Sequence, residues 1–134
     1  MARRAAAATT QLILALLRKI KKPLSAYDIL SRLADDGIKS PPTVYRALEQ
    51  LQEKHEVHKL AGLNAFVACD HRHGGKNCDH SHAIGFAICR SCGAVAELAH
   101  ASLDTALSEL SQKSGYQFGD TVIEMYGMCQ GCKR

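Results

Sequence analysis

Apolar residues near the start of the chain recur at the spacing of amphipathic helices. The first such segment has an i, i+3, i+4, i+7 pattern, formed by Ile13, Leu16, Leu17 and Ile20. Pro23 marks the end of this predicted helix. Ser25 followed by Asp28 has the spacing of a capping box and predicts the start of a second helix. Gly37 is placed to end that helix, whose apolar face comprises Ala26, Ile29, Leu30 and Leu33.

A third helix and two short strands are predicted next. Ser40 followed by two prolines indicates a helix start, because proline is tolerated where the first helical amides have no partner. One face of this helix carries Val44, Leu48 and Leu51, and another carries Thr43, Arg46 and Gln50, with Tyr45 beside them. Residues 56–60 and 64–68 have the pattern of two strands joined through Gly62. Three helices and a hairpin predict a winged helix-turn-helix, whose last helix enters the major groove of DNA.

The second half has a different pattern. It predicts a strand at 94–98, a helix ended by Gly115 and a strand at 121–126 that is suited to an exposed sheet edge. The apolar face of the helix comprises Leu103, Ala106, Leu107 and Leu110. The fold class is therefore α+β, with an N-terminal winged helix-turn-helix followed by a small α/β domain. We expect a winged-helix domain at 1–69, a His/Cys-rich loop at 70–82 and a second small domain at 83–134.

Charge and cysteine are unevenly distributed between the halves. Residues 1–60 carry 11 Lys and Arg against 6 Asp and Glu, whereas residues 61–134 carry 6 against 7 and contain all six cysteines. This distribution favours a polyanion partner for the first half and metal for the second, although +5 is also compatible with a merely soluble surface. The longest apolar run, Leu12–Leu17, is too short to span a bilayer, and residues 1–10 lack a secretion-signal pattern. We expect a cytoplasmic protein whose cysteines are metal ligands rather than disulfides.

Two CxxC pairs give the strongest motif in the chain. Cys89 and Cys92 form the first pair, and Cys129 and Cys132 form the second after 36 intervening residues. Two residues between cysteines let both thiolates of a turn face one ion, and two such turns complete a tetrahedron around Zn²⁺. A redox CxxC is the alternative, but that motif opens a helix after a strand, and neither pair has this setting. The four cysteines therefore predict a structural zinc site, with redox chemistry as the weaker alternative.

The helix-turn-helix segments resemble those of the ferric uptake regulator superfamily, most closely its zinc-uptake branch. The resemblance is carried by Ser-Ala-Tyr-Asp-Ile-Leu at 25–30 and Pro-Pro-Thr-Val-Tyr-Arg-Ala-Leu at 41–48, and it extends over nearly the whole chain. It implies that Tyr27 and Arg46 read bases, with Thr43 and Tyr45 also at the DNA. Arg can grip guanine O6 and N7 together, and tyrosine can pack on thymine methyls or bond phosphate. The alternative is that the tyrosines cover the core and Arg46 is a solvated helix residue.

The same resemblance implies a regulatory zinc site formed by His58, Cys69, His82 and Glu97. One thiolate, two imidazoles and a carboxylate favour Zn²⁺ over Fe²⁺ or Mn²⁺. The implied function is that of a zinc-responsive repressor, a homodimer that binds palindromic operator DNA when this site holds zinc and controls zinc-uptake genes. The resemblance implies two Zn²⁺ per chain, one structural and one regulatory, no enzymatic activity, and no membrane or small-molecule partner. By the same resemblance, residues 1–69 are the DNA-binding domain, 70–82 a His/Cys-rich hinge loop, and 83–134 the dimerisation and zinc-binding domain.

Several departures from the family pattern leave alternatives open. The loop between Cys69 and His82 is longer than in the zinc-uptake branch and adds further ligand types, namely His71, His73, Cys78 and His80. Cys78 or His80 could replace a regulatory ligand, or the extra set could bind a third zinc. Iron-type members carry histidines where this chain has Ile84 and Phe86, which disfavours an iron- or peroxide-sensing sibling; a heme-responsive one is also left open. The helix that usually precedes Thr10 is missing here or reduced to residues 1–9.

Overall fold

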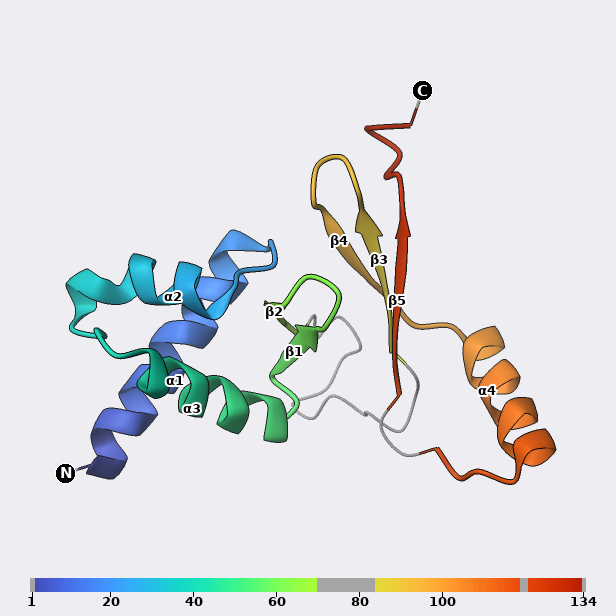
Figure 1. Cartoon of the computed structure of the whole chain (residues 1–134), viewed down its shortest axis with the longest axis horizontal. Coiled ribbons are helices and arrows are strands. Elements are labelled where there is room, and N and C mark those ends of the chain that lie inside the picture. Colours follow the sequence, from blue (N-terminus) through green and yellow to red (C-terminus); the bar gives the residue numbers. More distant parts are fainter. Residues whose placement is uncertain (1, 70–83, 119–120, 134) are drawn as a thin grey trace. The chain divides into compact units, whose positions relative to one another are not determined.

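Three helices and a hairpin form the first of the two units into which the chain divides, Met1–Cys69 (Figure 1). The structure is a computed structural model that describes residues 2–69, 84–118 and 121–133. Helix α1 spans Ala2–Ile20. The segment before Thr10 is therefore helical, as a direct continuation of α1 rather than as a missing or separate helix. The four consecutive alanines at 5–8 explain this extension, since Ala has the highest intrinsic helix propensity.

Helix α2 spans Ala26–Leu33 and begins with the predicted capping box. The N–H of Asp28 donates to Ser25 Oγ over 3.1 Å, and the N–H of Ser25 donates to Asp28 Oδ2 over 3.1 Å. The hydrogen bonds from Ser25 lower the pKa of Asp28, because they favour its ionised form. A turn of 3₁₀ helix, η1 at Ala34–Asp36, follows α2 directly. Gly37 ends this segment with φ of 91°, a left-handed conformation that glycine adopts without strain.

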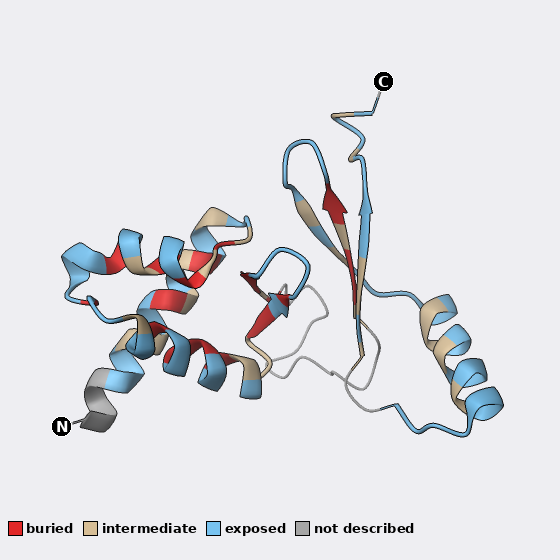
Figure 2. Ribbon diagram, in the orientation of Figure 1, coloured by how far each residue is buried: buried red, intermediate tan, exposed pale blue. Residues whose placement is uncertain are grey.

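Helix α3 spans Pro41–Glu53 and supplies much of the core of the first unit. Its predicted apolar face is confirmed, because Val44, Leu48 and Leu51 are all buried. Figure 2 shows the buried residues on the facing sides of the three helices and on the hairpin. The core is apolar and comprises Ile13, Leu17, Leu24, Ala26, Ile29, Leu33, Ile38, Val44, Ala47, Leu48, Leu51, Val57 and Phe66.

The hairpin consists of β1 at Val57–Leu60 and β2 at Ala65–Ala68, each starting one residue later than predicted. The strands are antiparallel, with Val57 opposite Ala68 and Leu60 opposite Ala65. The outer edge of β2 pairs with Leu24, since Leu24 and Phe66 exchange backbone hydrogen bonds of 3.0 and 2.8 Å. The segment between α1 and α2 is thereby attached to the wing, which completes the predicted winged helix-turn-helix.

The second unit, Asp70–Arg134, contains a three-stranded sheet of order β4-β3-β5. The strands are β3 at Ile84–Cys89, β4 at Val95–Leu98 and β5 at Val122–Gly127. β3 pairs antiparallel with β4 and parallel with β5. The sequence pattern missed β3, the central strand, although its apolar run Ile-Gly-Phe-Ala-Ile is typical of a strand buried on both faces. The prediction that β5 is an edge strand is confirmed.

Helix α4 spans Ala101–Ser114 and ends, as predicted, at Gly115. It lies close to the sheet at Gly85, where an added Cβ would come within 3.7 Å of Leu103 Cδ2 and 3.0 Å of Met125 Cε. Its apolar face is nevertheless poorly covered within this unit: none of its residues is buried, and Leu110 is 54% exposed. In the part of the chain that the structure describes, no helix combines the length and apolarity needed to cross a membrane.

Replacing Ser25 with Ala removes the side-chain acceptor at the start of α2. We expect Ser25→Ala to lower the free energy of unfolding of the first unit by about 1 kcal/mol, the usual effect of losing such a cap. Urea unfolding followed by circular dichroism measures this change. Ser31→Ala is the matched control, because Ser31 is exposed in the interior of α2. Equal stability of the two variants would contradict a stabilising role for the cap.

Candidate functional site

The β3–β5 pairing brings the two CxxC pairs to the same end of the second unit's sheet. Cys89 is the last residue of β3, and it lies opposite Gly127, the last residue of β5. The N–H of Arg90 donates to Gly127 O over 2.8 Å and continues the pairing by one residue. Because parallel strands that end together release their following turns at one edge, the two CxxC segments emerge side by side.

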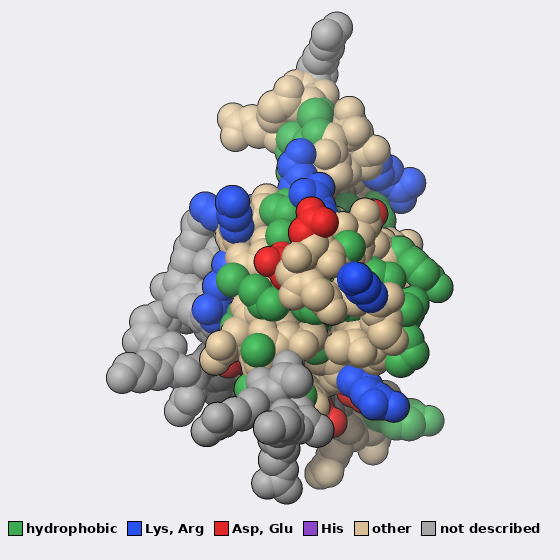
Figure 3. Space-filling model, turned by 90° about the vertical axis from the view of Figure 1, so that its left-hand side faces the viewer, with side chains coloured by type: hydrophobic (Ala, Val, Ile, Leu, Met, Phe, Trp, Pro, Cys, Tyr) green, Lys and Arg blue, Asp and Glu red, His purple; other side chains and the backbone are tan. Residues whose placement is uncertain are grey.

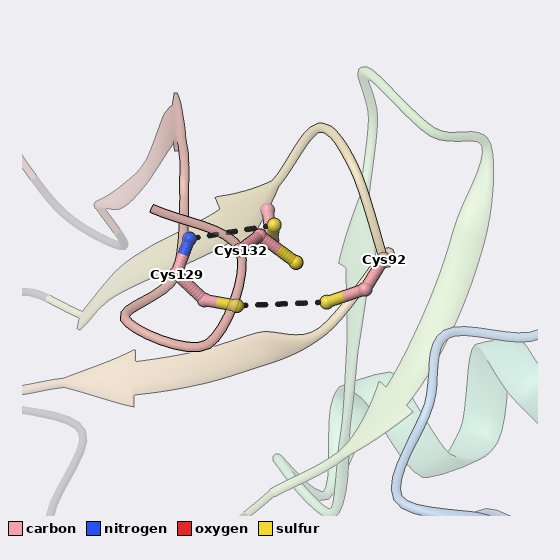
Figure 4. A group of neighbouring side chains, drawn as sticks. Cys92, Cys129 and Cys132 are labelled. Carbon is pink, nitrogen blue, oxygen red and sulfur yellow. Dashed lines mark hydrogen bonds between the residues drawn. The ribbon is translucent and has the colours of Figure 1, made fainter. Parts of the chain in front are cut away.

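Each CxxC segment is a tight turn closed by backbone hydrogen bonds. In the first turn, the N–H of Gly93 donates to Cys89 O over 3.0 Å, and Gly93 has φ of 74°. In the second turn, the N–H groups of Cys132 and Lys133 donate to Cys129 O over 3.0 and 2.9 Å. These turns direct two sulfurs each toward a common centre (Figure 4).

The spacing of the four sulfurs fits a tetrahedral metal ion. All four Sγ atoms, from Cys89, Cys92, Cys129 and Cys132, lie within 4.8 Å of one another. The sulfurs of Cys92 and Cys129 are 3.7 Å apart. Two thiolates bound to Zn²⁺ at about 2.3 Å in a tetrahedron are separated by about 3.8 Å. The four predicted cysteines are therefore brought together at the separation that zinc requires.

Hydrogen bonds within the centre shift the pKa values of two of its thiols in opposite directions. Backbone N–H groups, first that of Cys92 and then that of Cys129, lower the pKa of Cys89 to about 6. Hydrogen bonding with the sulfur of Cys129 raises the pKa of Cys132 to about 12. A divalent ion bound at this centre would favour the thiolate form of all four cysteines.

A second pair of ligand types lies in the first unit. His58 on β1 is 8% exposed, and among the described residues it is the one charged or polar side chain that is buried. Cys69, also buried, follows β2, and its N–H donates to Glu56 O over 2.9 Å. A ring nitrogen of His58 and the sulfur of Cys69 lie within 4.8 Å of each other. One imidazole and one thiolate at this separation are suited to sharing a single ion.

The other predicted ligands of the regulatory site lie in the second half of the chain. Glu97 lies on β4 in the second unit and is half-buried. His82 and the alternative ligands Cys78 and His80 lie outside the described residues, as do His71 and His73. The assignment of these residues to the regulatory site therefore stays a prediction.

The predicted DNA-reading residues lie on the exposed sides of α2 and α3. Tyr27 on α2 is 66% exposed and Tyr45 on α3 is 46% exposed, while Thr43 and Arg46 are also exposed. This exposure argues against the alternative that the two tyrosines serve to cover the core. The basic side chains of this unit are also open to solvent, because every Lys and Arg from Arg18 to Lys59 is exposed. Figure 3 shows Lys and Arg side chains spread over one face of the molecule.

Two features of the metal centre escaped the sequence pattern. The first is the central strand β3, whose register with β5 places the cysteines. The second is Arg90, inside the first CxxC turn, whose guanidinium lies over the ring of Tyr126 at 5.5 Å from its centroid. No local spacing rule links these two side chains, so the contact emerges only from the strand pairing.

A family model of known sequences matches most of the chain. The sequence model described as Ferric uptake regulator family matches residues 6–126. A zinc uptake regulation protein of Escherichia coli (strain K12) is 37% identical over 110 residues, which are 81% of this chain and 61% of that protein. The chain thus spans less than two thirds of the length of this curated relative.

Two solved structures have similar folds. A zinc uptake regulator complexed with zinc and DNA gives a TM-score of 0.81 at 34% identity, over 92% of this chain and 80% of that one. A structure of holo XcZur gives 0.78 at 33% identity, over 92% of this chain and 83% of that one. Both likenesses extend over the helical and the sheet-containing parts of the chain.

Loss of one sulfur should disable the four-cysteine centre. We expect Cys92→Ser and Cys132→Ser to lose the tightly held metal and to destabilise the second unit, because metal binding and folding share one free energy at such sites. Metal content by elemental analysis and thermal unfolding measure the two effects. Ser108→Ala, an exposed change on α4, is the control. A metal-free Cys92→Ser protein with unchanged unfolding would disprove the structural role.

Proposed function

This chain belongs to the ferric uptake regulator family, and we propose that it is a zinc-responsive transcriptional repressor controlling zinc-uptake genes. It binds operator DNA as a homodimer when its regulatory site holds Zn²⁺. The observation that carries this proposal is the combination of a four-sulfur centre with a separate buried His58–Cys69 pair beside a winged helix-turn-helix. The relatives described as zinc uptake regulators support the same ion.

The DNA-binding function belongs to residues 1–69. Helix α3 enters the major groove, where Arg46 binds a guanine edge and Tyr45 and Thr43 contact neighbouring groups. Tyr27 on α2 contributes from the preceding helix. The exposed basic residues of this unit bind phosphates and supply the sequence-independent part of the affinity.

The structural zinc belongs to Cys89, Cys92, Cys129 and Cys132 within residues 83–134. When bound, the ion cross-links the two CxxC turns and thereby holds β5 on β3. The small sheet and the uncovered helix α4 bury little apolar surface within this unit, so the cross-link contributes a large part of its stability.

The regulatory zinc belongs to His58, Cys69, His82 and Glu97, with Cys78 and His80 as alternative ligands. His58 and Cys69 are part of the DNA-binding domain, residues 70–82 form the hinge loop, and Glu97 is part of the zinc-binding domain. A ligand set drawn from both domains makes zinc affinity depend on the domain arrangement. By linkage, zinc then favours the DNA-competent arrangement, with a coupling free energy of about 1–3 kcal/mol.

The homodimer is supported by apolar surface that the second unit leaves uncovered. Val122 and Met125 on the edge strand β5 are exposed. So are Leu110 on α4 and the stacked rings of Tyr116 and Phe118, whose centroids are 6.5 Å apart. Exposed apolar surface beside a free strand edge is the usual mark of an interface, and a second copy related by a two-fold axis matches a palindromic operator.

A thiol oxidoreductase is the rival class, and the placement of the CxxC turns argues against it. A redox CxxC opens a helix, where the helix N-terminus activates the first thiol. Here the first pair lies in the turn between β3 and β4, and the second follows β5 without a helix. We therefore propose a regulator without enzymatic activity that acts in the cytoplasm, where genomic DNA is accessible and thiols stay reduced.

The direct test of DNA reading uses Arg46→Ala. We expect this change to cost about 1–3 kcal/mol of operator affinity and to relax the preference at one base pair. Lys19→Ala is the matched control, because Lys19 is exposed on α1 and should contact phosphate only. Lys59 is a poorer control, since its ammonium lies 5.9 Å from the centroid of the Phe66 ring.

Equilibrium binding to operator variants at several salt concentrations separates these effects. Lys19→Ala should weaken binding to every sequence alike and reduce the salt slope by about one counterion. A uniform loss for Arg46→Ala would instead place Arg46 at a phosphate and would overturn the proposed register of α3.

The test of zinc sensing is a zinc titration of operator binding, with zinc per chain counted by elemental analysis. We expect the wild-type chain to hold two Zn²⁺, or three if the additional loop ligands bind one. Cys69→Ser should keep the four-cysteine zinc and the dimer but lose zinc-dependent DNA binding, because the regulatory site then lacks its one thiolate.

Cys78→Ser is the matched control for that experiment. It removes a thiol from the His/Cys-rich loop and should leave the zinc response intact if Cys69 is the regulatory ligand. The opposite result, with the response lost in Cys78→Ser and kept in Cys69→Ser, would transfer the sensing role to the longer loop. If both variants kept their zinc-dependent DNA binding, neither cysteine would be a ligand of the regulatory site.

A further inference from the structure

The first CxxC turn contacts β5 through a side chain that does not bind metal. Arg90 follows Cys89 directly, and its guanidinium carbon lies 5.5 Å from the centroid of the Tyr126 ring. Tyr126 lies on β5, one residue before the glycine that aligns with Cys89. A guanidinium over an aromatic face is attracted by the ring quadrupole, and it also packs its planar surface against the ring.

Backbone contacts hold Arg90 in position for this interaction. Its N–H donates to Gly127 O over 2.8 Å, which fixes the start of the turn against the end of β5. Two residues beyond Gly127, the N–H of Cys129 approaches Cys89 Sγ at 3.4 Å. The guanidinium–ring contact therefore lies beside the point where the second CxxC turn begins.

The Tyr126 ring is itself held in place. Its hydroxyl donates to Glu124 Oε1 over 3.1 Å, along the same strand. Burial, followed by the interaction with Glu124, raises the pKa of Tyr126. The ring is 38% exposed, so the contact operates in a partly solvated setting.

Backbone hydrogen bonds order the two turns of the four-cysteine centre, and the contact of Arg90 with Tyr126 adds a side-chain contribution. The second turn follows the end of β5, and Met128 between them is exposed. Helix α4 has no buried residue. Bringing the two turns together costs conformational entropy, so a contact that orders them before the ion binds raises the affinity of the site.

We propose that Arg90 and Tyr126 form a clasp that holds the two CxxC turns together and slows zinc loss from the four-cysteine centre. Both are positioning residues, since neither offers a metal ligand at this centre. The inference rests on the proposed structural zinc and adds the kinetic control of its release.

The experiment measures zinc transfer from the zinc-loaded, full-length protein to a chromogenic chelator. Loss of the clasp in Arg90→Gln or Tyr126→Leu should accelerate release of the four-cysteine zinc about three- to tenfold, equivalent to about 0.7–1.4 kcal/mol, as fits a partly exposed cation–π contact. Tyr126→Phe keeps the ring and loses only the bond to Glu124, so its release rate should stay within about twofold of wild type, because the contact between the guanidinium and the ring remains.

Two controls separate the clasp from general effects. Lys133→Gln removes one positive charge beside Cys132 without touching the clasp, and it should leave the release rate near that of wild type. The double variant Arg90→Gln/Tyr126→Leu should release zinc no faster than the faster single variant, because both changes break the same contact. Alkylation of the cysteines by iodoacetamide in the metal-free protein gives a second readout, and it should be faster in both single variants.

Each outcome has a distinct meaning. Additive effects in the double variant, or equal acceleration by Lys133→Gln and Arg90→Gln, would overturn the clasp in favour of independent or purely electrostatic effects. Wild-type release rates in both single variants would also overturn it while leaving the zinc site intact. Absence of zinc from the wild-type four-cysteine centre would instead refute the proposed function on which the clasp rests.

Discussion

The parallel pairing of β3 with β5 is the contact on which the second unit depends. It aligns Cys89 with Gly127, so both CxxC turns leave one end of the sheet at the separation that a tetrahedral ion requires. A sheet of three short strands with an uncovered helix gains little from apolar burial alone. The pairing and a four-sulfur cross-link therefore support each other: the strands bring the ligands together, and a bound ion keeps the strands in register.

The first unit was well predicted from the sequence because its determinants are local. The periodicity through Ile13 and Val44 and the capping box at Ser25 act over one or two helical turns, and all three appear in the structure. The second unit was predicted only in part, because β3 is a short apolar run that periodicity alone does not distinguish from other buried segments. Its parallel partner lies far along the chain, beyond the reach of any local pattern.

The candidate sites also differ in whether local sequence or long-range strand pairing determines them. The four cysteines could be predicted, because two residues between ligands in a tight turn encode a metal chelate by themselves. The proximity of His58 to Cys69 follows from the register of a short hairpin, which the sequence placed within one residue. The contact of Arg90 with Tyr126 could not be predicted, because it depends on which residues of two distant strands face each other.

The separation of the two CxxC turns also sets an order of events during synthesis. A ribosome adding about 5–20 residues per second needs roughly 2–7 s to cover the 36 residues between Cys92 and Cys129. The helical first unit, built on nearby contacts, has time to fold in that interval, whereas β3 still lacks its parallel partner. An ion captured then is held by two sulfurs instead of four. The four-cysteine site can therefore bind its ion with all four sulfurs only after Cys129 and Cys132 have been synthesised, whatever the zinc concentration.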